Sequence, residues 1–233
     1  MLIAEMWRHF FAHPTVDLSR FDQPLKVLEP MCGTCEGRKI LKENFDIELA
    51  YKGFDYAANM VALAKEAYPD AEIWQDDATK IDGSAHSVDV VMIAGGIHHV
   101  SAQAADVVDR LSQALRPGGL FIVAEPTHNN PLLRWVREFI YRRNRAFDAE
   151  TERGFTTGEL DQFFIRAGLT PVRKSYPTLL AYVLWGCPEA FPALDRGPLW
   201  LARSWTRFER LFWNTSLAKW AGFGTFAAYR KDR

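Results

Sequence analysis

The segment KVLEPMCGTCEGR, residues 26–38, contains a short apolar strand, a tight turn with two cysteines and the start of a charged helix. This order of strand, loop and helix is typical of the nucleotide-binding loop of an α/β enzyme, in which Gly33 would let the backbone approach a ligand. Read from Cys32 to Cys35, the same letters are typical of a dithiol redox motif, which also lies between a strand and a helix N-terminus. The rest of the sequence has to decide between the two interpretations.

Apolar and polar segments alternate along the first half of the chain. Five runs have the length and composition of strands: Leu25–Glu29, Leu49–Phe54, Ala71–Trp74, Val88–Ala94 and Leu120–Ala124. Helix-compatible segments, such as 57–67 and 102–115, separate them. This alternation predicts a mainly parallel sheet with helices on both faces. The fourth and fifth runs are almost continuously apolar, so we expect them at the centre of the sheet, where both faces of a strand are covered.

The two ends of the chain follow a different pattern. Residues 1–22 are predicted to be helical, because aromatic and aliphatic residues recur there at helical spacing. After the fifth strand we expect an arginine-rich helix over 132–147. The next helix is predicted to begin at a capping box of Thr156 and Glu159 and to end at Gly168. Strands over 170–176 and 224–230 would enclose a long aromatic segment, and the two insertions are where an α/β enzyme would form its substrate pocket.

Length and composition favour one globular domain. With 233 residues, of which 48% are hydrophobic, the chain can bury a substantial core and fits one decorated α/β domain better than two. Glu5 and Arg8 interrupt the apolar character of the first residues, which argues against a secretion signal. The apolar stretch Leu179–Trp185 is far shorter than the ~20 residues of a membrane span. The three cysteines indicate a reducing compartment, so we expect a cytoplasmic protein without a transmembrane segment.

Charge is distributed unevenly along the chain. The net charge is −1, but the residues after Pro126 hold 17 lysines and arginines against 10 aspartates and glutamates, which gives +7 there and −8 for the rest. A net charge so close to zero argues against a nucleic-acid partner. Six of the eight tryptophans lie in the basic part. Either arginine stems cover apolar surface there, or this part offers a pocket or surface to an anionic or amphipathic partner.

Acidic residues follow the next strands where an adenosine-containing cofactor would need them. An acid that binds the ribose hydroxyls should end the second strand about 20 residues after the first loop, and Asp55 ends the run LAYKGFD. WQDDAT, residues 74–79, places two more acids after the third strand. SVDVVMIAGG, residues 87–96, and LRPGGLFIVAEP, residues 115–126, supply the fourth and fifth strands. The ordered set favours the nucleotide-binding interpretation.

In order and spacing these motifs resemble those of the class I S-adenosylmethionine-dependent methyltransferases, strongly over residues 26–126 and more weakly to the end. VLEPMCGT resembles the first motif of that family, GFD its ribose-binding acid and DDAT its adenine-contacting loop. The resemblance implies a Rossmann-like three-layer sandwich of the α/β class, with a mainly parallel seven-stranded sheet, an antiparallel last strand and helical cap insertions. A dehydrogenase would carry a full GxGxxG after the first strand, which is absent.

We therefore predict one methyltransferase domain over residues 1–233. Its predicted parts are an N-terminal helical lid over 1–22, a cofactor-binding core over 23–126, and cap insertions with the last strands over 127–233.

The resemblance implies S-adenosyl-L-methionine as the cofactor. The residues implied to bind it are Glu29, Met31, Cys32, Gly33, Thr34, Asp55, Tyr56, Met60, Asp76, Asp77, Ala78, Ala94 and Gly95. Glu29 would face the methionyl amino group and Asp55 the ribose, while Tyr56 and Met60 would flank the adenine. The chain departs from the family at Met31 and Cys35, where glycines are usual, so a non-catalytic scaffold that keeps the fold is an alternative.

The cysteines have little further support as a redox motif. Nothing near Cys32 and Cys35 supplies the rest of a thioredoxin-like domain, and both can pack as small residues of the loop. Cys187 is isolated, and no spacing of cysteine and histidine indicates zinc, so we expect no metal.

Candidate catalytic residues follow the fourth and fifth strands. Methyl transfer from a sulfonium is an in-line displacement that needs alignment and exclusion of water, and an oxygen nucleophile is helped by a base. GGIHHV supplies His98 and His99, and EPTHNN supplies Glu125 and His128. Each histidine could instead pack, cap a helix or lie in solvent. The absence of an NPPY-like tetrapeptide argues against a nucleic-acid amine as acceptor.

The acceptor is the least specified part of the prediction. We predict methyl transfer to a small molecule, first of all O-methylation of a sugar, polyketide or acid of specialised metabolism. The densest basic run is Arg134, Arg137, Arg142, Arg143 and Arg145. It is either a solvated face, a clamp for a carboxylate or phosphate, or, with its aromatic neighbours, a helix at the membrane surface. The last option corresponds to a lipidic or quinone substrate and to peripheral membrane contact.

Overall fold

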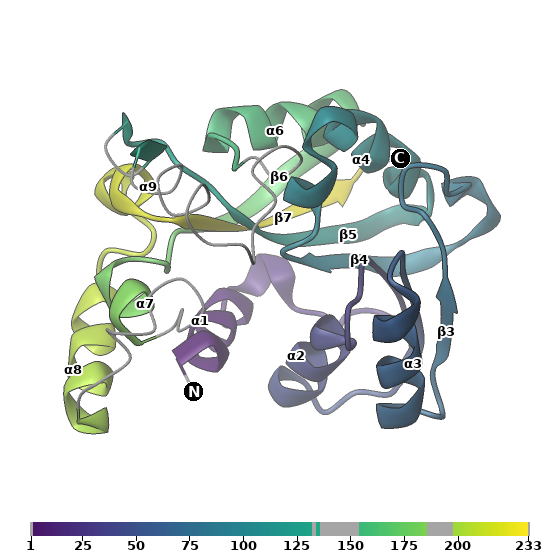
Figure 1. Cartoon of the computed structure of the whole chain (residues 1–233), viewed down its shortest axis with the longest axis horizontal. Helices are drawn as coiled ribbons and strands as arrows, with labels where there is room; N and C mark the ends of the chain where they lie inside the picture. Colours follow the sequence, from purple (N-terminus) through teal and green to yellow (C-terminus); the bar gives the residue numbers. More distant parts are fainter. Residues whose placement is uncertain (1, 132–133, 136–153, 186–197, 233) are drawn as a thin grey trace.

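The computed structural model describes residues 2–131, 134–135, 154–185 and 198–232. A seven-stranded sheet in the order β3-β2-β1-β4-β5-β7-β6 forms the middle layer (Figure 1). The strands are β1 (Leu25–Pro30), β2 (Leu49–Asp55), β3 (Glu72–Gln75), β4 (Val88–Ala94), β5 (Leu115–Pro126), β6 (Leu169–Ser175) and β7 (Gly224–Lys231). The first five strands are parallel, and β7 is antiparallel to both β5 and β6. The predicted sheet, with its antiparallel last strand, is confirmed.

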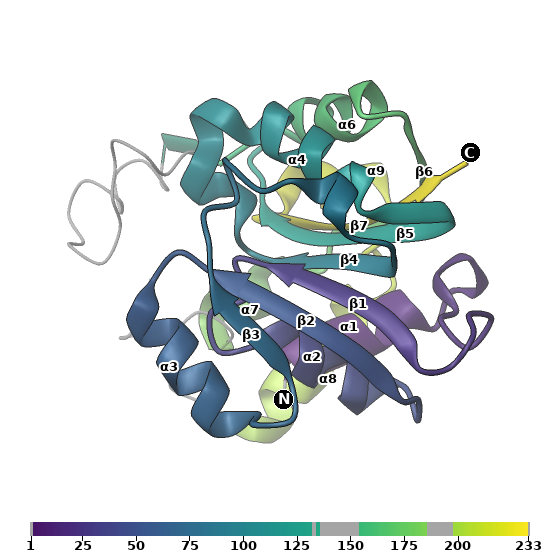
Figure 2. The same cartoon turned by 90° about the vertical axis from the view of Figure 1, so that its right-hand side faces the viewer.

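Helices cover both faces of the sheet, as the alternation of the sequence predicts (Figure 2). They are α1 (Leu2–Phe11), α2 (Glu36–Asn44), α3 (Ala58–Ala67), α4 (Ala104–Gln113), α6 (Thr157–Arg166), α7 (Leu180–Trp185), α8 (Leu199–Glu209) and α9 (Ser216–Ala221), with short 3-10 helices η1 (Pro14–Val16), η2 (Gly83–Ala85) and η3 (Ile97–Gln103). In both views α4 and α6 lie on one side of the sheet and α1, α2 and α3 on the other. The three-layer sandwich is confirmed.

Alternate residues of each central strand point into separate cores. Val90 of β4 belongs to the core on the α1 and α2 side, and Val91 belongs to the core under α4 and α6. The same alternation holds in β5, where Leu120 and Phe121 lie in different cores. Because a strand presents successive side chains to opposite faces, a strand covered on both sides has to be apolar throughout. This is why the two most apolar runs of the sequence occupy the centre of the sheet.

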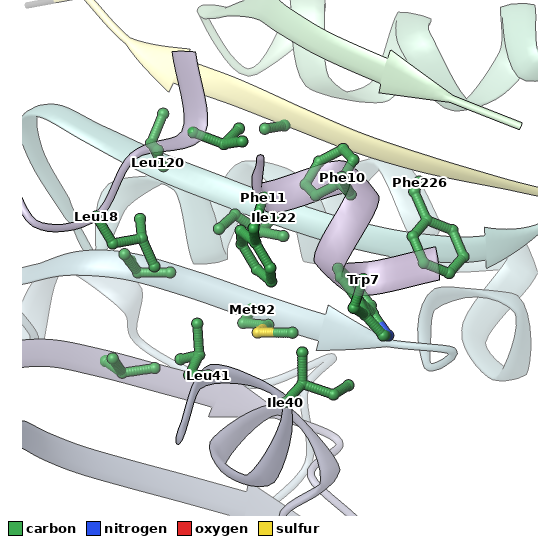
Figure 3. Packing of buried hydrophobic residues seen from close by; sticks show 14 of the residues in the cluster. Trp7, Phe10, Phe11, Leu18, Ile40, Leu41, Met92, Leu120, Ile122 and Phe226 are labelled. Atoms are coloured by element: carbon green, nitrogen blue, oxygen red, sulfur yellow. The ribbon is translucent and has the colours of Figure 1, made fainter. Parts of the chain in front are cut away.

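The N-terminal helix is shorter than the sequence predicts. A helix over residues 1–22 is wrong, because α1 ends at Phe11 and a 3-10 turn begins at Pro14. Proline has no N–H to continue the helical hydrogen bonds and disfavours a helical conformation of the residue before it. The apolar side of α1 nevertheless packs as expected (Figure 3): the Trp7 ring lies 5.6 Å from that of Phe11 and 4.4 Å from that of Phe226 in β7. That residues 1–22 act as a lid stays a prediction.

The capping box expected at α6 is present. The side chain of Thr156 accepts a hydrogen bond from the backbone N–H of Glu159, and the Glu159 carboxylate accepts one from the backbone N–H of Thr156. The helix ends before Gly168, whose φ of +75° is the left-handed conformation that glycine favours at such an end. The aromatic segment after β6 contains α7, α8 and α9.

Some predictions lie outside the described residues. They are the helix over 132–147, the arginines Arg137, Arg142, Arg143 and Arg145, and Cys187. Arg134 and Trp135 are described, and both are exposed. Among the residues described, no helix is long and apolar enough to cross a membrane.

Candidate functional site

The loop that follows β1 has an unusual backbone. Met31, Gly33 and Cys35 have φ values of 51°, 52° and 66°, all in the left-handed region that favours glycine. Met31 and Cys35 are the positions where the family pattern has glycines, so the loop keeps a glycine-like conformation despite its side chains. A left-handed residue other than glycine costs about 1–2 kcal/mol. The Cβ of Met31 lies 3.0 Å from the position that a Cβ on Gly96 would take, so a side chain at Gly96 would press against Met31.

Glu29, the one acid of β1, is buried and binds the start of α2. Its Oε1 accepts a hydrogen bond from the Gly37 N–H at 2.7 Å, and its Oε2 accepts one from the Arg38 N–H at 3.0 Å. The Tyr51 hydroxyl donates to Oε2 at 2.6 Å. Burial raises the pKa of Glu29 to about 8, although these three donors oppose the rise. Sequence reasoning missed Tyr51 and Gly37, because partners far apart in sequence carry no local signal.

Asp55, at the end of β2, is hydrogen-bonded to the loop after β1. Its Oδ2 accepts a hydrogen bond from the Gly33 N–H at 2.8 Å, and its Oδ1 accepts one from the Ala57 N–H at 2.9 Å. No atom lies within 4 Å of the position that a Cβ on Gly33 would take, so this side of the loop is open. Asp55 and the open side of Gly33 therefore lie together, as the nucleotide-binding interpretation expects.

The residues after β2 and β3 reach the same edge of the sheet. The Asp76 N–H donates to the Asp55 carbonyl at 3.1 Å. Tyr56, which follows Asp55, is 73% exposed, and Met60, in the first turn of α3, is 37% exposed, so both large side chains have free surface. Ala78 is buried. Apolar surface left uncovered beside an acid suits the adenosine half of a nucleotide better than a packed core.

The two acids after β3 have separate local roles. Asp76 accepts hydrogen bonds from the Trp74 indole N–H at 3.1 Å and from the Asp77 N–H at 2.8 Å. Asp77 accepts from the backbone N–H and the hydroxyl of Thr79 at 2.9 and 2.7 Å, and its carboxylate lies 3.0 Å from the Lys80 ammonium. The hydrogen bonds from Thr79 lower the pKa of Asp77. Both acids hold the turn that follows β3.

Glu125, near the end of β5, accepts hydrogen bonds from the loop that follows β4. Its Oε1 accepts hydrogen bonds from the N–H groups of Gly96 and Ile97 at 2.8 and 2.7 Å. Its Oε2 lies 3.3 Å from the backbone N and 2.9 Å from the Nδ1 of His98. All four groups are donors when Nδ1 carries the hydrogen, which leaves the lone pair of the ring on Nε2. The structure thus brings two of the predicted catalytic residues into direct contact.

The other two candidate histidines lie in different surroundings. His99 is exposed, and its ring centroid lies 4.0 Å from that of His98. His128 is buried in the loop after β5, and its N–H donates to the Phe155 carbonyl at 2.9 Å, next to the start of α6. Ala94 ends β4, and Gly95 follows with a φ of +83°.

Cys32 and Cys35 are free thiols and both are buried. The Cys35 N–H donates to the Cys32 carbonyl at 2.7 Å and closes the turn of the loop. A side-chain hydrogen bond between the two thiols lowers the pKa of Cys35 to about 7 and raises the pKa of Cys32. Thr34, between them, is exposed. In the described part of the chain, no group of three or more histidine, cysteine or acidic side chains is arranged to hold a metal ion.

Comparison with known proteins identifies the same stretch of chain. Residues 27–119 match the family model of a methyltransferase domain. The ubiquinone/menaquinone biosynthesis C-methyltransferase UbiE of Campylobacter jejuni is 29% identical over 107 residues, which are 44% of this chain and 45% of that protein. The chain thus spans less than half the length of the curated relatives it matches.

Solved structures share the fold over almost the whole chain. An S-adenosylmethionine-dependent methyltransferase from Archaeoglobus fulgidus is 13% identical, with a TM-score of 0.61 over 99% of this chain and 93% of that one. The [4+2]-cyclase SpnF is also 13% identical, with a TM-score of 0.61 over 98% of this chain and 80% of that one. At such identities the likeness shows the fold alone, and the second structure illustrates that this fold hosts more than one chemistry.

Proposed function

We propose, from the premise that residues 27–119 form a domain of the class I S-adenosylmethionine-dependent methyltransferases, that this chain transfers a methyl group to an oxygen of a small-molecule acceptor. The family match implies S-adenosylmethionine as the cofactor. The observation that carries the proposal is the pairing of Glu125 with Nδ1 of His98 at 2.9 Å, at the end of the sheet where β1 and β2 present Gly33 and Asp55. A histidine held in this way is a suitable base for a hydroxyl acceptor.

The residues at the ends of β1 and β2 fit the cofactor. Each oxygen of Asp55 accepts one backbone N–H and keeps a lone pair for a ribose hydroxyl. The open side of Gly33 allows the backbone to approach a ligand, and Thr34 beside it is exposed. Tyr56 and Met60 offer exposed apolar surface to the adenine. When bound, the cofactor supplies an electrophilic methyl group on a sulfonium.

In this proposal His98 and Glu125 have separate roles in proton removal. Nε2 of His98 accepts the proton that the acceptor hydroxyl loses, and the Glu125 carboxylate stabilises the resulting imidazolium through Nδ1–H. Glu125 is buried and faces four donors, so it acts as a positioning residue and not as a second base. The same carboxylate holds the N–H groups of Gly96 and Ile97, so the loop carrying His98 has a fixed geometry.

A second acceptor class has its own support. The relative from Campylobacter jejuni is a C-methyltransferase of quinone biosynthesis, which favours a quinone-type acceptor methylated on carbon. Its similarity to this chain covers 107 residues, whereas the insertions that follow β5 and β6 shape an acceptor pocket in this fold class. We therefore place the sugar, polyketide or acid acceptor first and the quinone second. A non-catalytic scaffold is the third candidate, because Met31 and Cys35 replace glycines.

Cofactor binding is tested by calorimetric titration with S-adenosylhomocysteine. We expect micromolar affinity for the unchanged chain and a loss of at least tenfold for Asp55→Ala, because two ribose hydroxyls lose their acceptor. Asp46→Ala, at an exposed acid before β2, is the matched control and should bind normally. If the unchanged chain shows no binding, the proposal fails at its first step.

Acceptor class is tested by incubation with methyl-labelled cofactor and a panel of sugars, hydroxylated polyketides, organic acids and quinones. Label in an O-methyl product supports the first proposal, and label on a quinone carbon supports the second. Cofactor binding without any turnover on this panel would favour the scaffold.

A further inference from the structure

Of the α8 side chains that the structure describes, the large apolar ones are exposed and the buried ones are small or polar. Its buried residues are Ala202, Thr206 and Glu209. Trp200 is 67% exposed and Phe208 54% exposed, on the side that faces away from these three. A surface helix normally directs its apolar stripe toward the core. This reversal needs an explanation that the proposed methyl transfer does not supply.

The orientation of α8 is fixed by polar contacts on its buried side. The Glu209 carboxylate accepts the Ala181 N–H at the start of α7 at 3.0 Å and the Trp205 indole N–H at 2.7 Å. The Thr206 hydroxyl donates to the Ala202 carbonyl at 2.8 Å. The last two bonds lie within α8, whereas the bond between Ala181 and Glu209 joins α8 to α7. Rotation of α8 would leave the buried Glu209 carboxylate without the Ala181 N–H, which favours the observed orientation with the aromatic residues outside.

The exposed apolar residues of α8 form a row along the helix, and α9 exposes further apolar residues at the same end of the molecule (Figure 1). Leu201, Trp205 and Phe208 follow one another at helical spacing, and the rings of Trp205 and Phe208 lie 5.9 Å apart. Phe212 extends the row, with its ring 5.3 Å from that of Phe208. Leu211 is 74% exposed, and Leu217 and Trp220 of α9 are more than half exposed. We call these residues of α8, α9 and the turn between them, together with Trp200, the aromatic face.

Within residues 198–222 the exposed charges are all positive, and the guanidinium of Arg210 also lies 3.7 Å from the half-buried Glu5 carboxylate of α1. Arg203, Arg207, Arg210 and Lys219 are exposed. Glu209 is the one acid among residues 198–222, and it is buried. On α8 the three arginines occupy one flank of the helix and the apolar row the other. Aromatic side chains beside arginines, without exposed acids, match the headgroup layer of an anionic bilayer.

The aromatic face lies at the end of the molecule where β5 leaves the sheet. In Figure 1, α8 and α9 form the left end of the molecule. The side-chain amide of Asn129, in the loop after β5, donates to the Lys219 carbonyl of α9 at 2.7 Å. The same loop carries His128. Contact of this face with a bilayer would therefore bring the carboxyl end of β5 toward the lipid.

We infer that α8 and α9 dock this protein on the surface of an anionic lipid bilayer, with the aromatic face in the headgroup layer and the arginines against lipid phosphates. A protein partner would need acids to match the arginines and a preformed apolar groove for the tryptophans. A bilayer supplies both anionic groups and apolar depth at any orientation of the helix in its plane. The proposal goes beyond methyl transfer and does not depend on it.

The test is co-sedimentation of the full chain with unilamellar vesicles of phosphatidylcholine, alone or mixed equally with phosphatidylglycerol. We expect binding to the mixed vesicles, at least tenfold weaker binding to phosphatidylcholine alone, and loss of the preference at high salt. The double variant Trp200→Gln with Leu211→Gln should bind the mixed vesicles at least tenfold more weakly. Arg203→Glu with Arg207→Glu should abolish the preference for anionic lipid.

Matched control variants distinguish binding through the aromatic face from nonspecific binding to vesicles. Ile165→Gln on α6 and Leu63→Gln on α3 remove apolar residues that are 48% and 51% exposed, and Lys65→Glu reverses a charge on α3. All three should bind vesicles like the unchanged chain. Thermal midpoints and S-adenosylhomocysteine affinity should be equal throughout, so that a failure of cofactor binding is recognised separately.

Two results would overturn the inference. One is that the unchanged chain does not sediment with the mixed vesicles, or that the variants on α8 bind as it does. The other is a dimer in analytical ultracentrifugation that Trp200→Gln converts to a monomer, which would assign the aromatic face to contact between two copies of the chain.

Discussion

Oε2 of Glu125 lies 2.9 Å from Nδ1 of His98, although 26 residues separate the two in sequence. The pairing arises because β4 and β5 are parallel neighbours, so the loops that follow them start at the same edge of the sheet. The carboxylate also holds the backbone of that loop at Gly96 and Ile97. The position of His98 therefore depends on β5 as much as on its own strand.

Replacement of His98 should separate proton removal from cofactor binding. We expect His98→Ala to lower kcat by about 10²–10⁴-fold, the usual contribution of a general base, and to leave the affinity for S-adenosylhomocysteine unchanged. Glu125→Gln should lower kcat by about tenfold or more, since an amide nitrogen cannot accept Nδ1–H. His99→Ala is the control and should retain activity. Normal turnover by His98→Ala would place the base elsewhere.

Substitution of Gly33, in the loop after β1, and of Gly37, at the start of α2, should have different effects. In Gly33→Ala the new Cβ meets no atom within 4 Å, so the loss of stability should be limited to the ~1–2 kcal/mol of a left-handed φ. Its affinity for S-adenosylhomocysteine should fall at least tenfold, because the Cβ occupies the open side of the loop. The measurements are urea denaturation and calorimetric titration.

In Gly37→Ala the new Cβ would stand 2.7 Å from the carboxyl carbon of Glu29. Both the helix start and the carboxyl have to move, so we expect a loss of about 1–3 kcal/mol in the free energy of unfolding. Urea denaturation of Gly37→Ala and Gly33→Ala side by side measures the contrast. A Gly37→Ala protein as stable as the unchanged chain would contradict the close contact with Glu29.

Glu29 should make the folded state less stable as pH rises, whereas an ion-paired acid makes it more stable. Burial raises the pKa of Glu29 from its ordinary value of 4.5 to about 8, so the folded state binds one more proton than the unfolded chain between these values. The free energy of unfolding should fall as pH rises through this window, by at most about 1.4 kcal/mol per unit for one proton. Urea denaturation from pH 5 to 9 measures the slope, and Glu29→Gln should flatten it. An unchanged slope in Glu29→Gln would assign the effect to another group.

The ion pair of the buried Asp89 carboxylate with the half-buried Arg116 should contribute to folding. Asp89 accepts the Lys26 N–H at 2.9 Å and forms an ion pair with the Arg116 guanidinium. Arg116→Met would leave the buried carboxylate without its cation, and we expect a loss of about 1–3 kcal/mol in the free energy of unfolding. Arg166→Met, at an exposed arginine of α6, is the control and should change stability by less than about 0.5 kcal/mol. Equal urea midpoints for the two variants would contradict the expected contribution.

The sequence by itself determined the layers of the fold. A strand that has to be covered on both faces is apolar throughout, and a helix on one face repeats its apolar residues at 3.6 positions, so the order of elements can be read locally. It also located Asp55, because the residue that ends the second strand has to lie beside the loop after the first. The predicted helix over 1–22 was too long, because the prediction followed the apolar spacing and gave too little weight to Pro14. In the structure α1 ends at Phe11, before this proline.

The tertiary structure alone decided which side chains meet. Nothing in the sequence pairs Glu125 with His98 or Tyr51 with Glu29, because these contacts depend on strand order and register and not on spacing. It also decided that Met31 and Cys35 adopt the backbone of the glycines they replace, since the packing of their side chains determines whether a left-handed residue is tolerated. Local patterns specify elements, whereas contacts between elements specify the site.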